Sequence, residues 1–380
     1  MSRIAERNEG VSRLLRRIAV LLCALPLLAG CGAGSATVGS TPAVTALPAL
    51  TPLPTVTAPT ALPDRLHLRA APPNAITLIV QPDDGRAPVL DAFNNAQTSI
   101  NLIIYLLSDR DVITALKNAV LRGVAVRVLI EQSPCCANNN SMQRAVFSDL
   151  QEGGVQVQWT NPAFRLTHAK MAVIDGTTAL IMSQNLTKTS FTFNREANIV
   201  DRDPADVESL GALFEADWAR TPYAPTNPNL VIANADARRK LLAMINGTTK
   251  SLAIESEEMQ DPAIIDALIA AQKRGVAVRY IGSMAPMNGN NPQRDDNAAG
   301  RKRLAAAGVG VRLLATPYVH TKTMVADGTV AFVGSENFSA ASLDTNREIG
   351  LLTTDPTAIA RLTTVYTKDW TAGKPEPSSP

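Results

Sequence analysis

Two stretches of the sequence decide the fold: HAKMAVIDGTTALIMSQN (residues 168–185) and HTKTMVADGTVAFVGSEN (residues 320–337). Each begins with His-x-Lys, has Asp-Gly in the middle and ends with Ser-x-Asn, and they lie 152 residues apart. Asp-Gly between two apolar runs is typical of a β-hairpin turn. Each stretch is therefore predicted to be a two-stranded hairpin, with its His and Lys on the same face of the first strand.

The same shift of 152 residues relates further segments on both sides of the hairpins. These repeated segments are RGVAVR (122–127 and 274–279), Asn-Arg-Glu (194–196 and 346–348) and Asp-Trp (217–218 and 369–370). A register kept over so many positions indicates an internal duplication. We therefore expect two halves with the same fold, residues 74–222 and 223–372.

Each half alternates apolar strands with amphipathic helices. In the first half, the apolar run 99–107 is followed by segment 109–123, whose apolar residues recur at helical spacing before a glycine, and then by strand 124–130. Each half closes with a predicted helix, at 204–219 and 356–371. This alternation predicts an α/β fold in which each half has a mixed sheet flanked by helices.

The first 30 residues are predicted to be an export signal. Arg13, Arg16 and Arg17 lie just before the apolar run 18–30, which is shorter than the roughly 20 residues that span a bilayer. The run ends in Leu-Ala-Gly before Cys31, which resembles a bacterial lipobox. That resemblance implies a lipidated Cys31 that holds the protein at the extracytoplasmic face of the cell membrane. A plain secretory signal and a short uncleaved anchor are the alternatives.

Composition sets apart two segments that flank the halves. Residues 31–73 are rich in Ala, Thr and Pro and nearly free of charge, which is typical of an extended tether. Residues 373–380 are expected to be a disordered tail.

The charge balance bears on the substrate. Residues 1–30 hold five of the 36 Lys and Arg and two of the 34 Asp and Glu, which leaves 31 basic and 32 acidic residues. Proteins that bind nucleic acid through its phosphates usually carry a basic surplus. The balance therefore weakly disfavours a nuclease.

Two of the three histidines, His168 and His320, occupy equivalent positions of the repeat. A neutral histidine can act as a nucleophile and a protonated one as an acid, while a lysine on the same face can hold a phosphate oxygen. Each half offers the same set of candidate catalytic residues at the same offsets. The candidates are His168, Lys170, Asp175, Ser183, Asn185 and Glu196 in the first half, and His320, Lys322, Asp327, Ser335, Asn337 and Glu348 in the second.

These motifs resemble the two HKD motifs of the phospholipase D superfamily, and the resemblance covers about residues 75–372. It implies that the halves pack about a pseudo-twofold axis and that both motifs line one site, so that a monomer is complete. It also implies that one histidine attacks phosphorus to form a phosphohistidine and that the other protonates the leaving alcohol. By analogy His168 is the nucleophile and His320 the acid, although the near-symmetry leaves the order open.

The residue types fit these functions. Lys170 and Lys322 would stabilise the negative charge of the transition state, and the serine and asparagine pairs would extend the cradle for the oxyanion. Glu196 and Glu348 would accept a hydrogen bond from a histidine and fix its tautomer. The two motif aspartates open the hairpin turns and are interpreted as structural.

No metal and no cofactor are implied, because the lysines supply the positive charge. Cys135 and Cys136 are adjacent and show no zinc-site spacing, so we interpret them as loop residues without catalytic work. Met182 stands where the second motif has Gly334, which is expected to narrow the site without removing a reactive group.

The leading prediction is a phospholipase D-like phosphodiesterase that hydrolyses a phospholipid head-group ester. One alternative is an extracellular endonuclease of the same superfamily. Another is a phosphatidyl transferase of the cardiolipin synthase type, which the lack of spanning helices in the sequence disfavours. Outside the enzymes, the chain could be an inactive surface-binding module, which the intact motifs oppose.

Overall fold

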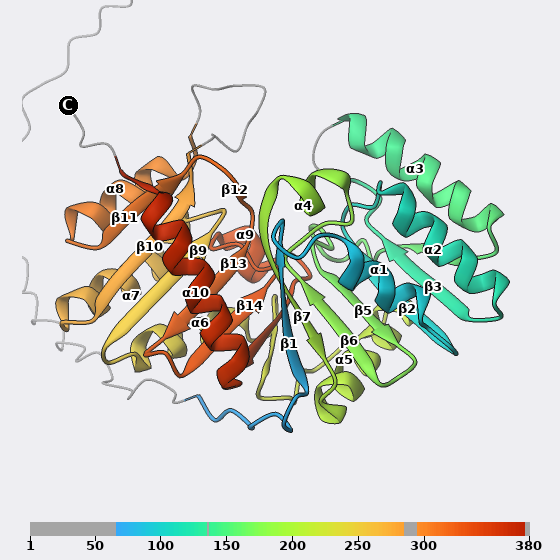
Figure 1. Ribbon diagram of the computed structural model, residues 1–380, viewed down its shortest axis with the longest axis horizontal. Coiled ribbons are helices and arrows are strands. Elements are labelled where there is room, and N and C mark those ends of the chain that lie inside the picture. Colours follow the sequence, from blue (N-terminus) through green and yellow to red (C-terminus); the bar gives the residue numbers. More distant parts are fainter. Residues whose placement is uncertain (1–65, 135–136, 285–294, 377–380) are drawn as a thin grey trace, which may run out of the picture. The chain divides into compact units, whose positions relative to one another are not determined.

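A computed structural model of the chain describes residues 66–134, 137–284 and 295–376. The predicted signal, the predicted lipidation site Cys31 and the pair Cys135 and Cys136 lie outside these residues. Two α/β halves follow each other along the chain, coloured blue to green and yellow to red (Figure 1).

The first half is built on a mixed sheet in the order β1-β7-β6-β5-β2-β3-β4. The strands are β1 (Ile76–Gln81), β2 (Ser99–Ile104), β3 (Ala125–Ile130), β4 (Gln156–Trp159), β5 (Lys170–Ile174), β6 (Thr178–Met182) and β7 (Asn194–Asp201). The helices are α1 (Ala87–Asn94), α2 (Arg110–Leu121), α3 (Ala137–Glu152), α4 (Lys188–Thr192) and α5 (Pro204–Ala219). Strands β2, β3 and β4 are parallel, and the others pair antiparallel.

The second half repeats this plan in the order β16-β11-β10-β9-β13-β14-β15-β8. Its strands are β8 (Leu230–Ile232), β9 (Ser251–Ser256), β10 (Ala277–Ser283), β11 (Gly310–Leu314), β12 (Tyr318–Val319), β13 (Lys322–Ala326), β14 (Val330–Gly334), β15 (Ile349–Thr353) and β16 (Lys374–Pro375). Its helices are α6 (Ala237–Gly247), α7 (Pro262–Lys273), α8 (Ala298–Ala306), α9 (Ala340–Asp344) and α10 (Pro356–Ala372). The predicted fold class is therefore confirmed.

Local sequence explains where the repeated helices begin and end. The side chains of Asp109 and Asp261 accept hydrogen bonds from the first turns of α2 and α7. Gly123 and Gly275 follow these helices with φ of +89° and +93°, which only glycine adopts without strain. The predicted strand 99–107 ends earlier, at Ile104, because the chain then leaves the sheet.

Three large apolar clusters fill the described part of the two halves. One lies between the first sheet and α1, α2 and α3, and another lies between the second sheet and α6, α7 and α8. The third cluster combines α5, α10 and strands of both sheets, so the halves share a core. Figure 1 shows α10 crossing the second sheet next to β1 of the first half.

Two segments that were predicted to lie outside the folded halves each have a part that packs against them. Arg69, within the predicted tether, forms ion pairs with Asp203 and Asp206. At the other end, β16 pairs with β11, and Glu376 accepts from Arg301 at 2.6 Å. The predicted disorder is therefore wrong for residues 373–376, because an ion pair and strand pairing hold a segment whose composition alone indicates no core. The tether stays a prediction for residues 31–65, which lie outside the described residues.

Two buried ion pairs join the halves at equivalent positions. Arg195 donates to Asp369 through Nε and Nη2 at 2.6 and 3.0 Å. Arg347 donates to Asp217 at 2.9 Å. The arginine of each half thus pairs with the aspartate of the other, which is the exchange expected of a pseudo-twofold arrangement.

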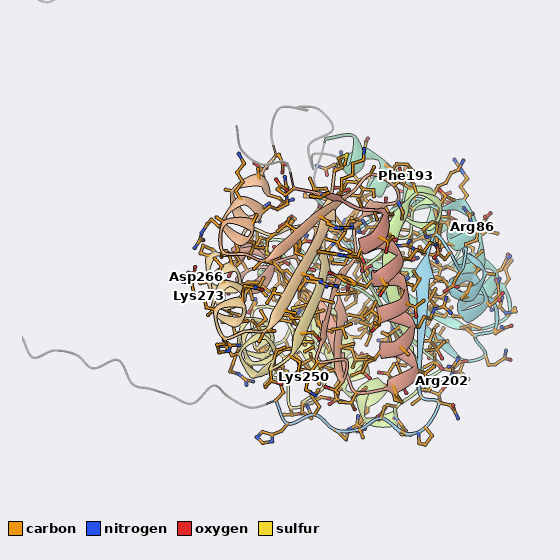
Figure 2. All side chains as sticks on the ribbon, turned by 60° about the vertical axis from the view of Figure 1, so that its left-hand side comes forward. Arg86, Phe193, Arg202, Lys250, Asp266 and Lys273 are labelled. Carbon is orange, nitrogen blue, oxygen red and sulfur yellow. The ribbon has the colours of Figure 1, made fainter. Side chains whose placement is uncertain are left out.

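We predict that Asp369→Ala lowers the free energy of unfolding by about 3 kcal/mol, because it leaves the Arg195 guanidinium buried without its main partner. Chemical denaturation measures the effect. The matched control is Asp266→Ala on α7, which removes an exposed pair with Arg303 and should cost less than about 1 kcal/mol (Figure 2). Equal losses in the two variants would contradict a structural contribution of the buried pair.

Candidate active site

The main chain of each motif lies against the Asn-Arg-Glu segment of the other half. Strand β12, just before His320, pairs in parallel with the start of β7, and the His320 N–H donates to the Arg195 carbonyl at 3.1 Å. In the same way, Thr167 forms a bridge with Arg347, and the His168 N–H donates to the Arg347 carbonyl at 2.9 Å. This exchange brings each histidine beside the glutamate of the opposite half.

The histidines and glutamates form two crossed pairs. Nδ1 of His168 lies 2.8 Å from Oε2 of Glu348, and Nδ1 of His320 lies 2.8 Å from Oε1 of Glu196. Both glutamate side chains are fully buried, whereas both histidine side chains are 12% exposed. A histidine that donates from Nδ1 to a buried carboxylate has its tautomer fixed and presents Nε2 for chemistry.

Each glutamate is held by further donors. Glu196 accepts from the hydroxyl of Ser183 at 2.6 Å and from Asn194 at 3.1 Å. Burial would raise the pKa of Glu196, but His320, Lys322 and the hydrogen bond from Ser183 lower it below its ordinary value. The carboxylate is therefore ionised where it meets the histidine.

The pair in the second half is supported in the same manner. Glu348 accepts from Ser342 at 2.7 Å and from Asn346 at 3.2 Å. His168, Lys170 and Ser342 lower its pKa against the opposing effect of burial. The Asn-Arg-Glu repeat is thereby explained, since its asparagine orients the glutamate and its arginine locks the halves together.

The two motif lysines are fully buried, and each donates to the carbonyl of its own histidine at 2.5 Å. The Lys170 ammonium lies 5.2 Å from the centre of the Tyr105 ring. Burial lowers the pKa of Lys170 to about 7, although Glu348 opposes this shift. The Lys322 ammonium instead donates to Glu257 at 2.7 Å.

His168 has the properties of a nucleophile. Burial lowers its pKa to about 4, with Glu348 opposing and both Lys170 and Lys322 adding to the shift. The ring is therefore neutral near pH 7, and the edge of the Tyr105 ring packs against it at 4.6 Å between centroids. The influence of Lys322 on His168 also shows that the two motifs share one electrostatic environment.

Asp175 and Asp327 hold the hairpins to the sheets. Each has a positive φ, 55° and 52°, at the turn. The Asp175 carboxylate accepts from the main-chain N–H groups of residues 97–99, and that of Asp327 from residues 249–251. Burial would raise the pKa of both carboxylates, but these N–H groups lower it. The carboxylates of both aspartates thus bind main-chain N–H groups that precede the strand beside their hairpin, and their interpretation as structural residues stays a prediction.

The other candidates differ in what they offer a phosphate. The Ser183 hydroxyl donates to Glu196, and the Ser335 hydroxyl accepts from the N–H of Ile349 at 3.1 Å. Both serine hydroxyls therefore form hydrogen bonds within the protein. Asn185 and Asn337 are buried, and Oδ1 of each accepts no hydrogen bond within the described part of the chain. Their contact with phosphate stays a prediction.

Met182 does not narrow the site as expected, because its side chain is fully buried in the core of the first half. The counterpart position 334 is occupied by glycine for a separate, steric reason. A Cβ there would lie 2.2 Å from Glu336 and 2.7 Å from Gly350, so the side chain of Glu336 occupies the space.

Tyr105 and Glu257 were missed by the sequence reasoning, although they lie at the motifs. The shift of 152 residues relates them, directly after β2 and β9. They differ in chemistry, so a search for repeated identities passes over them. Asking which polar residues follow equivalent strands would have found both.

Three further observations concern metal ligands, spanning helices and a surface cavity. Among residues 66–134, 137–284 and 295–376, no three His, Cys, Asp or Glu side chains cluster as metal ligands. Within the same ranges, no helix has the length and apolar character needed to cross a bilayer. A surface cavity of about 390 Å³ lined by Leu78, Arg202 and Arg361 contains none of the motif residues.

Comparison with known proteins places this arrangement in a family. The sequence matches the family described as "Cardiolipin synthase, PLD-like domain" twice, over residues 89–218 and 241–370. The chain therefore belongs to this phospholipase D-like family.

Among its relatives, cardiolipin synthase A of Pseudomonas fluorescens is 24% identical over 74% of this chain and 65% of its own length. The major cardiolipin synthase ClsA of Bacillus subtilis is 23% identical over 78% of this chain and 69% of its own length. The chain therefore spans about two thirds of these relatives. The crystal structure of phosphatidylserine synthase from Haemophilus influenzae covers 81% of this chain and 88% of its own, with a TM-score of 0.65 and 12% identity, which shows the shared fold.

We predict a bell-shaped pH dependence of kcat/KM for a chromogenic phosphodiester. Activity should fall as pH drops through about 4, because His168 gains a proton and stops being a nucleophile. It should also fall as pH rises through about 7, because Lys170 loses the charge that holds the phosphate. The fold is checked by circular dichroism at each pH, and a rate that keeps rising through the pKa of Lys170 would contradict the assignment.

A second prediction concerns the crossed carboxylates. Glu348→Gln should lower kcat roughly 10²- to 10⁴-fold with little change in KM, because His168 loses the ion that fixes its tautomer. Asp175→Asn is the control from the same motif set, and it should lower the unfolding midpoint while kcat stays close to the wild-type value. An unchanged kcat in Glu348→Gln together with a large loss of kcat in Asp175→Asn would contradict this function of Glu348.

Proposed function

We propose that this protein is a phosphatidyl transferase of the phospholipase D type, which moves the phosphatidyl group of a phospholipid to an alcohol through a phosphohistidine. The observation that carries the proposal is the pair of crossed His–Glu contacts, which supplies two oriented Nε2 atoms beside buried lysines. The relatives named cardiolipin synthases favour transfer over the hydrolysis that the sequence analysis put first.

The first step would form the phosphoenzyme. Nε2 of neutral His168 attacks phosphorus, the bond from phosphorus to the head-group oxygen breaks, and that oxygen takes the proton of His320. Lys170 and Lys322 stabilise the negative charge that develops on the phosphate oxygens. Glu348 keeps the attacking ring oriented throughout.

The second step would return the enzyme to its starting state. His320, now neutral, takes the proton of the incoming hydroxyl as its oxygen attacks phosphorus. The bond between phosphorus and Nε2 breaks, and its electron pair stays on His168. An alcohol gives a new phospholipid and water gives phosphatidic acid, so transfer and hydrolysis differ only in the attacking oxygen.

A lipid substrate agrees better with the charge than a nucleic acid does. With residues 1–30 left out, 31 basic residues face 32 acidic ones. We also propose that Cys31 is lipidated and holds the enzyme at the extracytoplasmic face of the membrane. The support for this anchor is the sequence of the first 31 residues alone.

The full chain, purified in detergent, should convert phosphatidylglycerol vesicles into products that contain the phosphatidyl group on a new glycerol-bearing alcohol. Mass spectrometry separates this product from phosphatidic acid, and His168→Ala should reduce turnover at least ~100-fold. Excess EDTA should leave the rate unchanged, since the lysines supply the charge.

Parallel reactions decide between the alternatives. Phosphatidic acid as the sole product would replace transfer by hydrolysis. Nicking of plasmid DNA that falls steeply with salt, without lipid turnover, would replace both by a nuclease. Binding to vesicles that His168→Ala leaves intact, with no turnover of any phosphodiester, would make the chain a binding module.

A further inference from the structure

Glu257 makes the two halves of the site unequal. Its Oε2 accepts from Lys322 Nζ at 2.7 Å and lies 3.5 Å from Nε2 of His320. His320 therefore has a carboxylate at each ring nitrogen, Glu196 at Nδ1 and Glu257 at Nε2. Both nitrogens can donate only in a ring that carries two protons.

The first half has a different residue in the same place. Tyr105 is the counterpart of Glu257, and its ring packs edge-on against His168 and lies beside the Lys170 ammonium. His168 thus has a carboxylate at Nδ1 and an aromatic ring beside it. The two motifs are alike in sequence, but the residues after β2 and β9 give their histidines opposite surroundings.

The place of Glu257 is fixed from several sides. Its main-chain N–H donates to Thr321 at 3.2 Å, and its carbonyl accepts from Asn297 at 2.8 Å. Tyr318 approaches its Oε1 through the hydroxyl at 3.4 Å. Burial would raise the pKa of the Glu257 carboxyl, but His320 and Lys322 lower it to about 2.

We infer that Glu257 is the positioning residue that divides the work between the two histidines. By holding Lys322 and facing Nε2 of His320, it reserves His320 for proton transfer and leaves His168 as the nucleophile. This inference rests on the proposed function, because it concerns which histidine forms the bond to phosphorus in that reaction.

Glu257 acts on His320 through its charge. A carboxylate beside Nε2 can accept a hydrogen bond from that nitrogen, and it repels the phosphate anion that a nucleophile must approach. Both effects suit Nε2 of His320 to proton transfer and not to attack on phosphorus. The charged and titratable groups around His320 are Glu196 on β7, Glu257 after β9, Tyr318 on β12 and Lys322 on β13.

The decisive experiment exchanges the two unequal residues. The wild type and the double variant Tyr105→Glu/Glu257→Tyr react with bis(4-nitrophenyl) phosphate, and alkali stops the reaction because phosphohistidine survives in base. Trypsin then gives peptide 166–170 with His168 and peptide 313–322 with His320. We expect the aryl phosphate on His168 in the wild type and on His320 in the double variant.

Each result has one meaning. Label on His168 in both proteins would overturn the inference and leave the proposed function in place. Absence of phosphohistidine in the wild type, under conditions where the substrate is turned over, would overturn the proposed function itself.

A single substitution keeps the inference testable if the double variant does not fold. Glu257→Gln should lower turnover of phosphatidylglycerol roughly 10- to 100-fold, because the alkoxide of the head group needs the proton of His320. Release of the first 4-nitrophenolate should be nearly unchanged, since that anion leaves without a proton. Glu257→Asp should restore most of the lipid activity, whereas an equal loss with both substrates would reduce Glu257 to a structural residue.

Discussion

The hydrogen bond between a histidine of one half and a buried glutamate of the other is the interaction on which this site depends. A carboxylate with no exposed surface needs a charged or donating partner, and both Glu196 and Glu348 find theirs across the interface. Separating the halves would leave two buried carboxylates without their histidines. Because both motifs belong to one chain, they are always present in equal number. The site itself forms only where the two halves are in contact.

Symmetry and chemistry make opposite demands on this arrangement. The crossed contacts and the exchanged arginine–aspartate pairs follow a pseudo-twofold relation, which would give the two histidines equal surroundings. A two-step displacement needs one neutral and one protonated ring at the same time. If Glu257 is the positioning residue inferred above, Tyr105 and Glu257 give the two histidines the unequal surroundings that the reaction needs, and one carboxylate then lies near the phosphate. The other repeated residues keep the interface symmetric.

The sequence predicts the fold class, the duplication and the histidines with their lysines, because all of these repeat at one fixed spacing. It does not predict which glutamate meets which histidine, since a repeat relates equivalent residues and not residues in contact. The hydrogen bond from Ser183 to Glu196 lies within the first half, and the repeat does not predict it either, because it depends on the pairing of β6 with β7. Residues 373–376 belong to the fold through the pairing of β16 with β11 and the ion pair of Glu376 with Arg301, long-range contacts that no local pattern of composition records.

In the proposed reaction, the choice between an alcohol and water as acceptor would depend on access to His320. Its side chain is 12% exposed, Glu257 lies 3.5 Å from its Nε2, and the Tyr318 hydroxyl lies 3.4 Å from the other oxygen of the same carboxylate. A hydroxyl next to an electron-rich carboxylate donates to it readily, whereas a second phosphate anion there is repelled. These surroundings suit the uncharged hydroxyl of a polyol head group. The residue that assigns the two histidines their separate tasks would thus also favour the kind of acceptor that a transferase needs.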